Sequence, residues 1–166
     1  MAVSGVAGSP RHAAVEAQAA LEEALAFVAV ARSRMHVAID GGDLAAGLRC
    51  AALVAGELRT SLLDPERYYQ LCEAVFCELQ HFALLLVEAG KRGVDLQAIY
   101  EAAQSEGNIL PRLYLLVTVG VVCAQSCCMR AEQVLEDLSV LLAGVQHPVR
   151  GLFLRYYFLQ CTKDVL

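Results

Sequence analysis

Asn-Ile-Leu-Pro-Arg-Leu-Tyr-Leu-Leu-Val-Thr-Val-Gly-Val-Val-Cys-Ala-Gln, from Asn108 to Gln125, is the stretch that decides the fold. Arg112 is its only formal charge, and apolar residues would cover every side if the segment formed a helix. A helix that is apolar all round is either buried on all sides or spans a membrane. The twelve residues from Leu113 to Ala124 are too few to span a membrane, which takes about 20. The stretch therefore predicts a central helix packed among other helices, with Pro111 in its first turn, where proline is tolerated.

Six further helices are predicted around this one from capping residues and from apolar residues spaced by threes and fours. Their expected ranges are 10–40, 44–62, 65–89, 96–106, 130–143 and 149–165. No segment alternates apolar and polar residues over the length of a strand. The fold class is therefore all-α. About seven helices joined by short links favour a right-handed α-solenoid of antiparallel helical hairpins, of the armadillo or HEAT kind.

The two ends of the chain differ in composition, and this difference sets the expected domain boundaries. The small residues near the N-terminus predict that residues 1–12 are disordered or frayed, so the solenoid is expected to occupy 13–166. The first helix carries polar outer residues that suit a terminal cap, whereas the last helix ends apolar and uncapped. A solenoid truncated at its C-terminal end is expected from this asymmetry. The last two helices should then expose an apolar patch, and its expected members are Leu152, Phe153, Phe158 and Leu159.

Composition limits the function classes. Of the 166 residues 57% are apolar, and the formal net charge of -5 argues against a surface that binds nucleic acid. Seven cysteines, an odd number, stand in a sequence whose first residues lack the pattern of a signal peptide. A reducing, cytosolic location is therefore expected.

A small thiol or zinc-binding protein is the alternative reading. Cys77 and His81 stand four residues apart on one helical face, with Cys72 nearby, which could supply zinc ligands. No second ligand pair has the required spacing, and cysteines on an apolar face also behave as small hydrophobic residues. Cys127 and Cys128 could form a redox switch or could be ordinary reduced thiols. Glycine-rich phosphate loops and nucleophile elbows are absent from the sequence, so neither an enzyme nor a cofactor is expected.

Three stretches resemble the N-terminal region of the vacuolar protein sorting 35 family, the long α-solenoid subunit of retromer. They are Gly-Glu-Leu-Arg-Thr-Ser-Leu-Leu at 56–63, Gly-Asn-Ile-Leu-Pro-Arg-Leu-Tyr-Leu-Leu-Val-Thr-Val-Gly-Val-Val at 107–122, and Gly-Val-Gln-His-Pro-Val-Arg-Gly-Leu-Phe-Leu-Arg-Tyr-Tyr-Phe-Leu-Gln-Cys-Thr at 144–162. The similarity extends from about Ala24 to Leu166. The sequence departs from the family pattern in the alanine-rich first helix and in the cysteine-rich link at 123–128.

The resemblance implies a cytoplasmic scaffold for protein transport, peripheral on the endosomal membrane through its partners. Its role would be endosome-to-Golgi retrograde transport and recycling. In the family, the region of the Pro-Arg-Leu-Tyr-Leu-Leu motif binds the arrestin-like retromer subunit. That motif here consists of Pro111, Arg112, Leu113, Tyr114, Leu115 and Leu116. Sorting nexins and cargo tails meet retromer near the same end, but no residues are assigned to them. The part of the family's solenoid that wraps the phosphoesterase-like subunit has no counterpart in this sequence.

Each motif residue also has a purely structural interpretation. Leu113, Leu115 and Leu116 could be core residues whose mutation would act by forming a cavity. The Tyr114 hydroxyl could bond inside the stack or reach a partner surface. Arg112 could form an internal salt bridge or meet a partner carboxylate, because a guanidinium beside an apolar helix requires pairing in either case.

Overall fold

The computed structural model describes residues 8–165, and within that range the chain forms seven α-helices, one short 3₁₀ helix and no strand. The helices are α1 (Pro10–Asp40), α2 (Leu44–Gly56), η1 (Glu57–Arg59), α3 (Pro65–Lys91), α4 (Leu96–Gln104), α5 (Ile109–Gln125), α6 (Ala131–Ala143) and α7 (Pro148–Thr162). The expected all-α class and the expected seven helices are confirmed.

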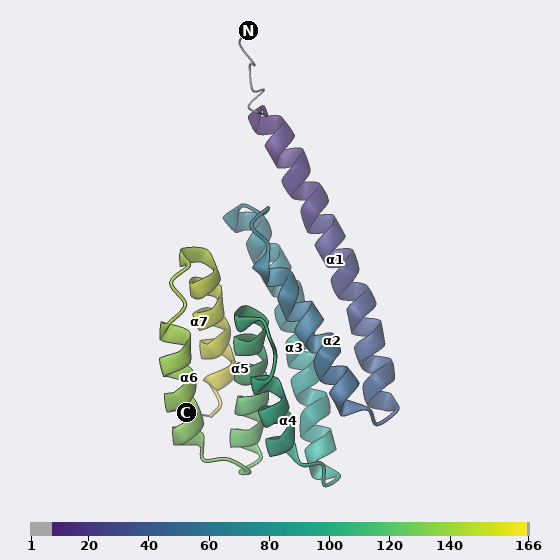
Figure 1. Ribbon diagram of the computed structural model, residues 1–166, viewed down its shortest axis with the longest axis vertical. Helices are drawn as coiled ribbons and strands as arrows, with labels where there is room; N and C mark the ends of the chain where they lie inside the picture. The colour runs from purple at the N-terminus through teal and green to yellow at the C-terminus, as the bar shows by residue number, and fades with distance from the viewer. Residues whose placement is uncertain (1–7, 166) are drawn as a thin grey trace.

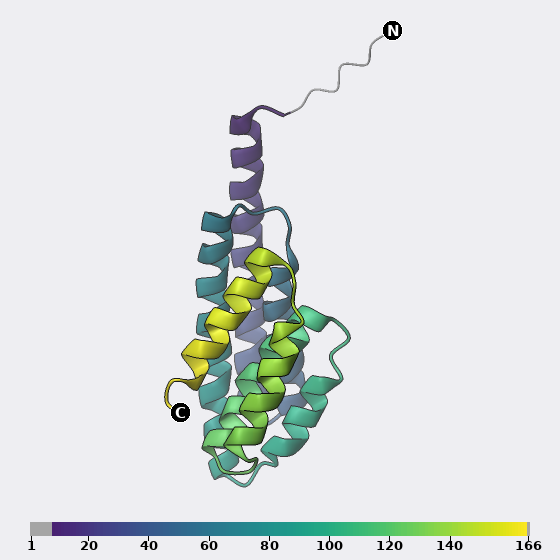
Figure 2. The same cartoon turned by 90° about the vertical axis from the view of Figure 1, so that its left-hand side faces the viewer.

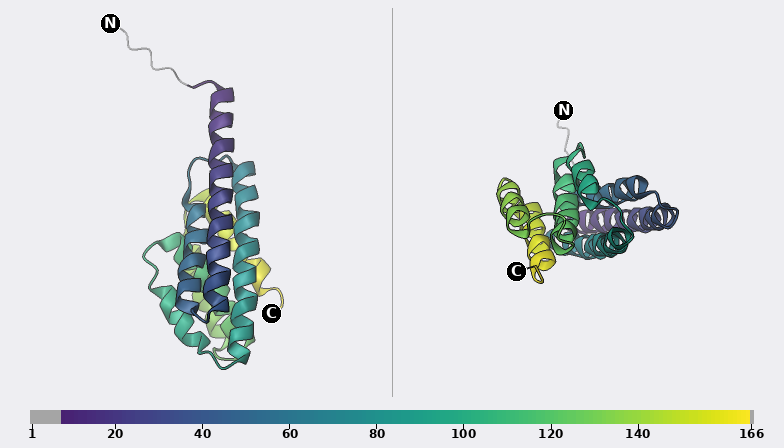
Figure 3. Two further views of the ribbon diagram at one scale, coloured as in Figure 1. Left: turned by 90° about the vertical axis from the view of Figure 1, so that its right-hand side faces the viewer. Right: turned by 90° about the horizontal axis from the view of Figure 1, so that it is seen from below.

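Successive helices run in alternating directions and stack as hairpins from α1 at one side to α6 and α7 at the other (Figure 1). Seen from below, roughly along the helix axes, α3 and α7 lie on one face of the stack, whereas α2, α4 and α6 lie on the other (Figure 3, right). The N-terminal end of α1 projects beyond the other helices (Figure 2). This arrangement is that of an α-solenoid; its handedness stays a prediction.

The central position expected for α5 is confirmed. Every residue from Leu113 to Ala124 is buried, and α5 contacts five other α-helices, which are α2, α3, α4, α6 and α7. Gly120 allows neighbouring helices to approach α5 closely, because a Cβ there would lie 3.1 Å from both the Tyr100 ring and a Val134 methyl group. The run of twelve residues without a polar side is therefore explained by a helix that other helices surround.

The helix starts follow the predicted capping signals. The side chains of Ser9, Asp43, Asp64 and Asp95 each accept a hydrogen bond from a backbone N–H of the following turn. Such bonds satisfy N–H groups that have no partner within the helix. His147 was not predicted as a cap, but its ring Nδ1 accepts from the Arg150 N–H at 3.2 Å.

Two predicted helix ends are wrong. The second helix does not continue to Leu62, which is 69% exposed; α2 ends at Gly56 and the chain leaves η1 at Thr60. Arg150 explains this exit, because its guanidinium donates to the carbonyls of Arg59 and Thr60 in place of helix N–H groups. The last helix ends at Thr162 rather than at residue 165.

At the N-terminal side, α1 already includes residues 10–12, which were expected to fray, because Ser9 caps its first turn. The same expectation of disorder or fraying covered residues 1–7, which lie outside the described residues. It also covered Gly8 and Ser9, which precede the helix.

Two polar contacts that sequence reasoning missed join α1 to α3. Arg32 Nε lies 3.4 Å from the carboxylate of Glu78, a residue that is only 7% exposed. One turn further along, the His36 ring stacks on His81 with centroids 4.4 Å apart. Both pairs lie between residues more than forty positions apart, so they follow from the packing of α1 on α3.

Among residues 8–165, α3 is the one helix long and apolar enough to cross a membrane. Core helices of soluble proteins can have the same length and apolar composition. Since α3 packs against α1, α2, α5 and α7, its role in the core explains its apolar content.

Candidate partner-binding surface at the start of the central helix

The first turns of α5 contain all six residues of the candidate motif, and the structure buries five of them. Exposed fractions are 4% for Leu113, 0% for Tyr114, 1% for Leu115 and 4% for Leu116. Pro111 is also buried, and Arg112 is half-buried. A partner can therefore reach this motif mainly through the arginine.

The three leucines are core residues, as their structural interpretation proposed. Leu115 faces α2 and α4, where it lies near Leu48 and Ala103. Leu113 and Leu116 lie on another side of α5 and form the floor of a shallow groove. Mutation of any of them to alanine would remove buried apolar contacts, so a loss of binding by such a variant would not by itself show an interface.

Tyr114 lies wholly inside the stack. Its ring centroid is 5.8 Å from that of Phe76 and 5.3 Å from that of Tyr157. Its hydroxyl has no hydrogen-bond partner among the described residues. Burial raises the pKa of Tyr114 well above its ordinary value, because a phenolate would lose its hydration there. The structure thus places Tyr114 in the core and out of a partner's reach.

Arg112 lines a groove of about 470 Å³ between the end of α4, the start of α5 and the end of α6. Ile109 and Leu141 border this groove and are 63% and 45% exposed. Within residues 8–165, the Arg112 guanidinium makes neither an ion pair nor a hydrogen bond. The internal salt bridge considered for Arg112 is therefore not formed in the described part of the chain.

A second groove, of about 440 Å³, lies on the other side of the first turn of α5. Pro111 forms one wall, and Phe27 of α1 and Leu53 of α2 contribute apolar side chains that are 40% and 51% exposed. We call the exposed or half-buried side chains Phe27, Leu53, Ile109, Arg112 and Leu141 the α5-start surface. Four of these five residues were not predicted from the sequence. They could have been found as large apolar residues that stand outside the core positions of their helices.

Comparison with known proteins places the chain in a family. The family model described as Vacuolar protein sorting-associated protein 35 matches residues 20–166. This chain belongs to that family. The expected family assignment is therefore confirmed. The match begins at residue 20, close to Ala24, where the resemblance was expected to begin.

Individual relatives agree with the family model. The chain is 44% identical over 145 residues to Vacuolar protein sorting-associated protein 35 of Dictyostelium discoideum, covering 87% of this chain and 18% of the relative. It is 43% identical over 132 residues to Vacuolar protein sorting-associated protein 35B of Arabidopsis thaliana, covering 80% of this chain and 17% of the relative. For the relative of Schizosaccharomyces pombe the identity is 35% over 147 residues, covering 88% of this chain and 18% of the relative. The chain thus spans less than a fifth of the length of these relatives.

Family membership favours the scaffold reading over the zinc reading, and the geometry agrees. Among residues 8–165, no three His, Cys, Asp or Glu side chains are grouped to hold a metal ion. Cys72 is buried, and burial raises the pKa of its thiol. Cys77 faces a groove beside α7, and His81 stacks on His36. The three suggested ligands therefore do not converge.

Cys127 and Cys128 lie in the turn that ends α5. The backbone N–H of Cys128 bonds to the Cys123 carbonyl at 3.1 Å, and that of Cys127 bonds to the Ala124 carbonyl at 3.2 Å. These two bonds form a Schellman motif, in which Cys127 occupies the left-handed position with φ 58°. Both thiols are free. A redox role for this pair stays a prediction.

The apolar patch expected on the last helices is present in part. Leu152 and Leu159 are 59% and 60% exposed. Phe153 and Phe158 are half-buried, and the Phe153 ring packs on Tyr68 with centroids 5.5 Å apart. The exposed patch therefore consists of leucines, while the phenylalanines help to attach α7 to the stack.

Proposed function

We propose that this chain is part of a retromer scaffold subunit that acts in endosome-to-Golgi retrograde transport and recycling. On this proposal it binds the arrestin-like retromer subunit through the α5-start surface. Membership of the vacuolar protein sorting-associated protein 35 family supports the transport role. The protein would work in the cytoplasm, peripheral on the endosomal membrane through its partners, with sorting nexins and cargo tails as further partners.

The unpaired guanidinium of Arg112 carries the proposal for the binding surface. A half-buried charge beside an apolar helix is costly unless it is paired, and Arg112 has no ion-pair or side-chain hydrogen-bond partner among residues 8–165. Exposed Ile109 and Leu141 flank it. Arginine is enriched among the residues that contribute most to binding energy at protein interfaces, and the fully buried centre of an interface is more apolar than the rest of the protein surface. A carboxylate of the partner would satisfy the guanidinium there.

Arg112→Glu tests this assignment. The change reverses the proposed charge contact, so binding to the arrestin-like subunit should weaken by at least about tenfold, since truncating one member of a buried charge pair costs about 2 kcal/mol or more. The fold should survive, because no internal ion pair is lost. Circular dichroism melting and partner pull-down on the same preparation would measure both effects.

Arg34→Glu is the matched control. Arg34 is an exposed arginine of α1 that lines none of the described grooves beside α5, so the same charge change there should leave binding unaltered. Unchanged binding by a folded Arg112→Glu variant would remove Arg112 from the interface. A large fall in the melting temperature would instead show that Arg112 supports the fold.

A further inference from the structure

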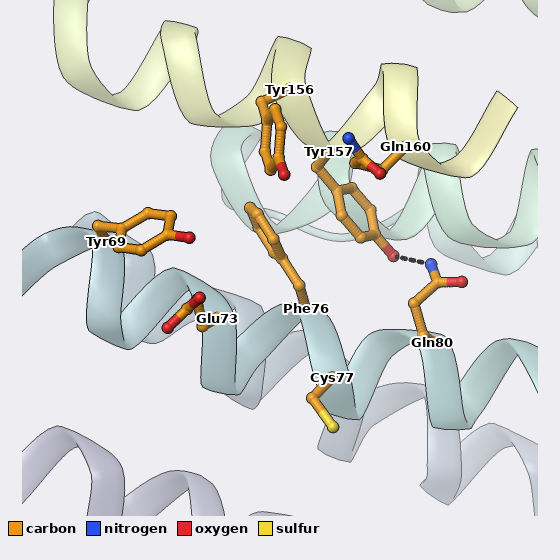
Figure 4. A pocket seen from close by; sticks show the side chains of 8 residues that line it. All are labelled: Tyr69, Glu73, Phe76, Cys77, Gln80, Tyr156, Tyr157 and Gln160. Carbon is orange, nitrogen blue, oxygen red and sulfur yellow. Dashed lines mark hydrogen bonds between the residues drawn. The ribbon is translucent and has the colours of Figure 1, made fainter. Parts of the chain in front are cut away.

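A groove of about 440 Å³ lies between α3 and α7 and shares no residue with the α5-start surface. We call it the α3–α7 groove. Its walls come from residues 69–80 of α3 and 156–160 of α7 (Figure 4). Because α3 and α7 lie on the same face of the stack (Figure 3), the groove opens on the side of the solenoid.

Four aromatic rings dominate this groove, and they are Tyr69, Phe76, Tyr156 and Tyr157. Phe76 lies at the centre, with its ring centroid 4.7 Å from that of Tyr157 and 6.4 Å from that of Tyr156. Tyr69 and Tyr156 at the rim are 42% and 43% exposed. Aromatic faces carry a negative quadrupole that attracts cations.

The polar groups of the groove, like its aromatic faces, favour a cation. Glu73 is its one charged lining residue, and this carboxylate beside the Tyr69 hydroxyl raises the pKa of Tyr69. Glu73 makes no ion pair within residues 8–165. The Gln80 amide nitrogen donates to Tyr157 at 3.0 Å and to Cys161 at 3.1 Å, so its carbonyl oxygen is the group left for a ligand. No lysine, arginine or histidine is among the described lining residues.

A surface of aromatic faces, acceptor oxygens and an unpaired carboxylate is complementary to a cation and repels phosphate groups. The volume falls within the range of about 300 to 1,000 Å³ that is usual for ligand pockets. An arginine side chain suits it best, since its planar guanidinium stacks on aromatic rings and donates to a carboxylate in the same pose.

We propose that the α3–α7 groove binds an arginine side chain in a segment of a partner protein. The guanidinium would lie over the Phe76 and Tyr156 rings and donate to Glu73, while neighbouring residues of the segment cover Tyr69. Such a site would add a second contact to the scaffold, independent of the α5-start surface.

The probe for this site is the peptide Ac-Gly-Gly-Arg-Gly-Gly-NH₂, compared with the same peptide containing citrulline, which keeps the shape and lacks the charge. The experiment is a nuclear magnetic resonance titration of the full chain. The arginine peptide should shift the ring resonances of Tyr69, Phe76 and Tyr156 in a saturable manner. The citrulline peptide should bind about fivefold more weakly or worse, which matches a cation–π and charge contribution at a partly exposed site.

Glu73→Gln should lower affinity for the arginine peptide by about the same factor. Glu101→Gln makes the same charge change on α4, which contributes no residue to the groove, and should leave affinity unaltered. Tyr156→Leu keeps an apolar rim without the aromatic face, and it should also weaken the arginine peptide selectively. Equal binding of the two peptides, full affinity in Glu73→Gln, or shifts confined to residues outside the groove would each overturn the proposal.

Discussion

At the residue scale, a chain of hydrogen bonds in the core has a defined direction. Thr118 Oγ1 donates its single proton to the Tyr114 carbonyl at 2.7 Å. Its contact with the Tyr157 hydroxyl, also 2.7 Å, must therefore be a bond that Tyr157 donates. Since Gln80 donates to Tyr157, the sequence of donors is Gln80, Tyr157, Thr118. This chain joins α3, α7 and α5.

The two buried tyrosines should consequently respond in opposite ways to loss of the hydroxyl. Tyr157→Phe breaks two hydrogen bonds and should lower the free energy of unfolding by about 1 to 2 kcal/mol. Tyr114→Phe removes a hydroxyl that has no partner in the described structure, so it should leave stability unchanged or raise it by up to about 1 kcal/mol. Urea denaturation of both variants would measure the difference. A Tyr114→Phe variant as unstable as Tyr157→Phe would mean that the Tyr114 hydroxyl has a partner after all.

At the element scale, Arg150 attaches the start of α7 to the segment that follows α2. Its guanidinium donates to the carbonyls of Arg59 and Thr60, about ninety residues earlier in the chain. These carbonyls belong to the exit from η1, where no helix N–H is available. Arg150 thus links α7 directly to the end of η1 through hydrogen bonds from its side chain to the backbone.

Arg150→Ala should lower the free energy of unfolding by about 1 to 3 kcal/mol, because it leaves the Arg59 carbonyl and the part-buried Thr60 carbonyl without this donor. Arg155→Ala is the control on the same helix. Arg155 is exposed and donates only one long bond, 3.4 Å, to the Val145 carbonyl, so its loss should cost less than about 0.5 kcal/mol. Thermal melts that show equal losses for both variants would contradict this role of Arg150.

At the scale of the whole molecule, the exposed leucines of α7 predict self-association. Leu152 and Leu159 lie on the same helix and are both more than half exposed. Exposed apolar patches promote contacts between molecules, so analytical ultracentrifugation at concentrations on the order of tens of micromolar should detect oligomers.

Leu159→Glu should shift the sedimentation profile toward the monomer, because a buried carboxylate at the contact would be desolvated. Val37→Glu, which places the same charge at an exposed apolar residue of α1, is the control and should not change the profile. A wild-type chain that sediments as a clean monomer and binds no dye for apolar surface would contradict the self-association prediction.

Much of the fold could be predicted because its determinants are local. Capping side chains and prolines mark the starts of α1, α3 and α7, and these signals act within one helical turn. The absence of a polar side from 113–124 predicted a fully enclosed helix, which the structure confirms. Leu62 was misplaced because the exit from α2 depends on Arg150, a residue far along the chain.

The candidate site could be located from the sequence, but its exposed residues could not. The sequence by itself determined the all-α class, the position of α5 and the family, since helical periodicity and motif identity are properties of contiguous residues. Only the tertiary structure decided that Tyr114 lies in the core, that Arg112 has no partner among residues 8–165, and that α3 and α7 together line an aromatic groove. The physical reason is that side-chain burial and pairing depend on contacts between helices, and these join residues that lie 39 to 91 positions apart in the chain.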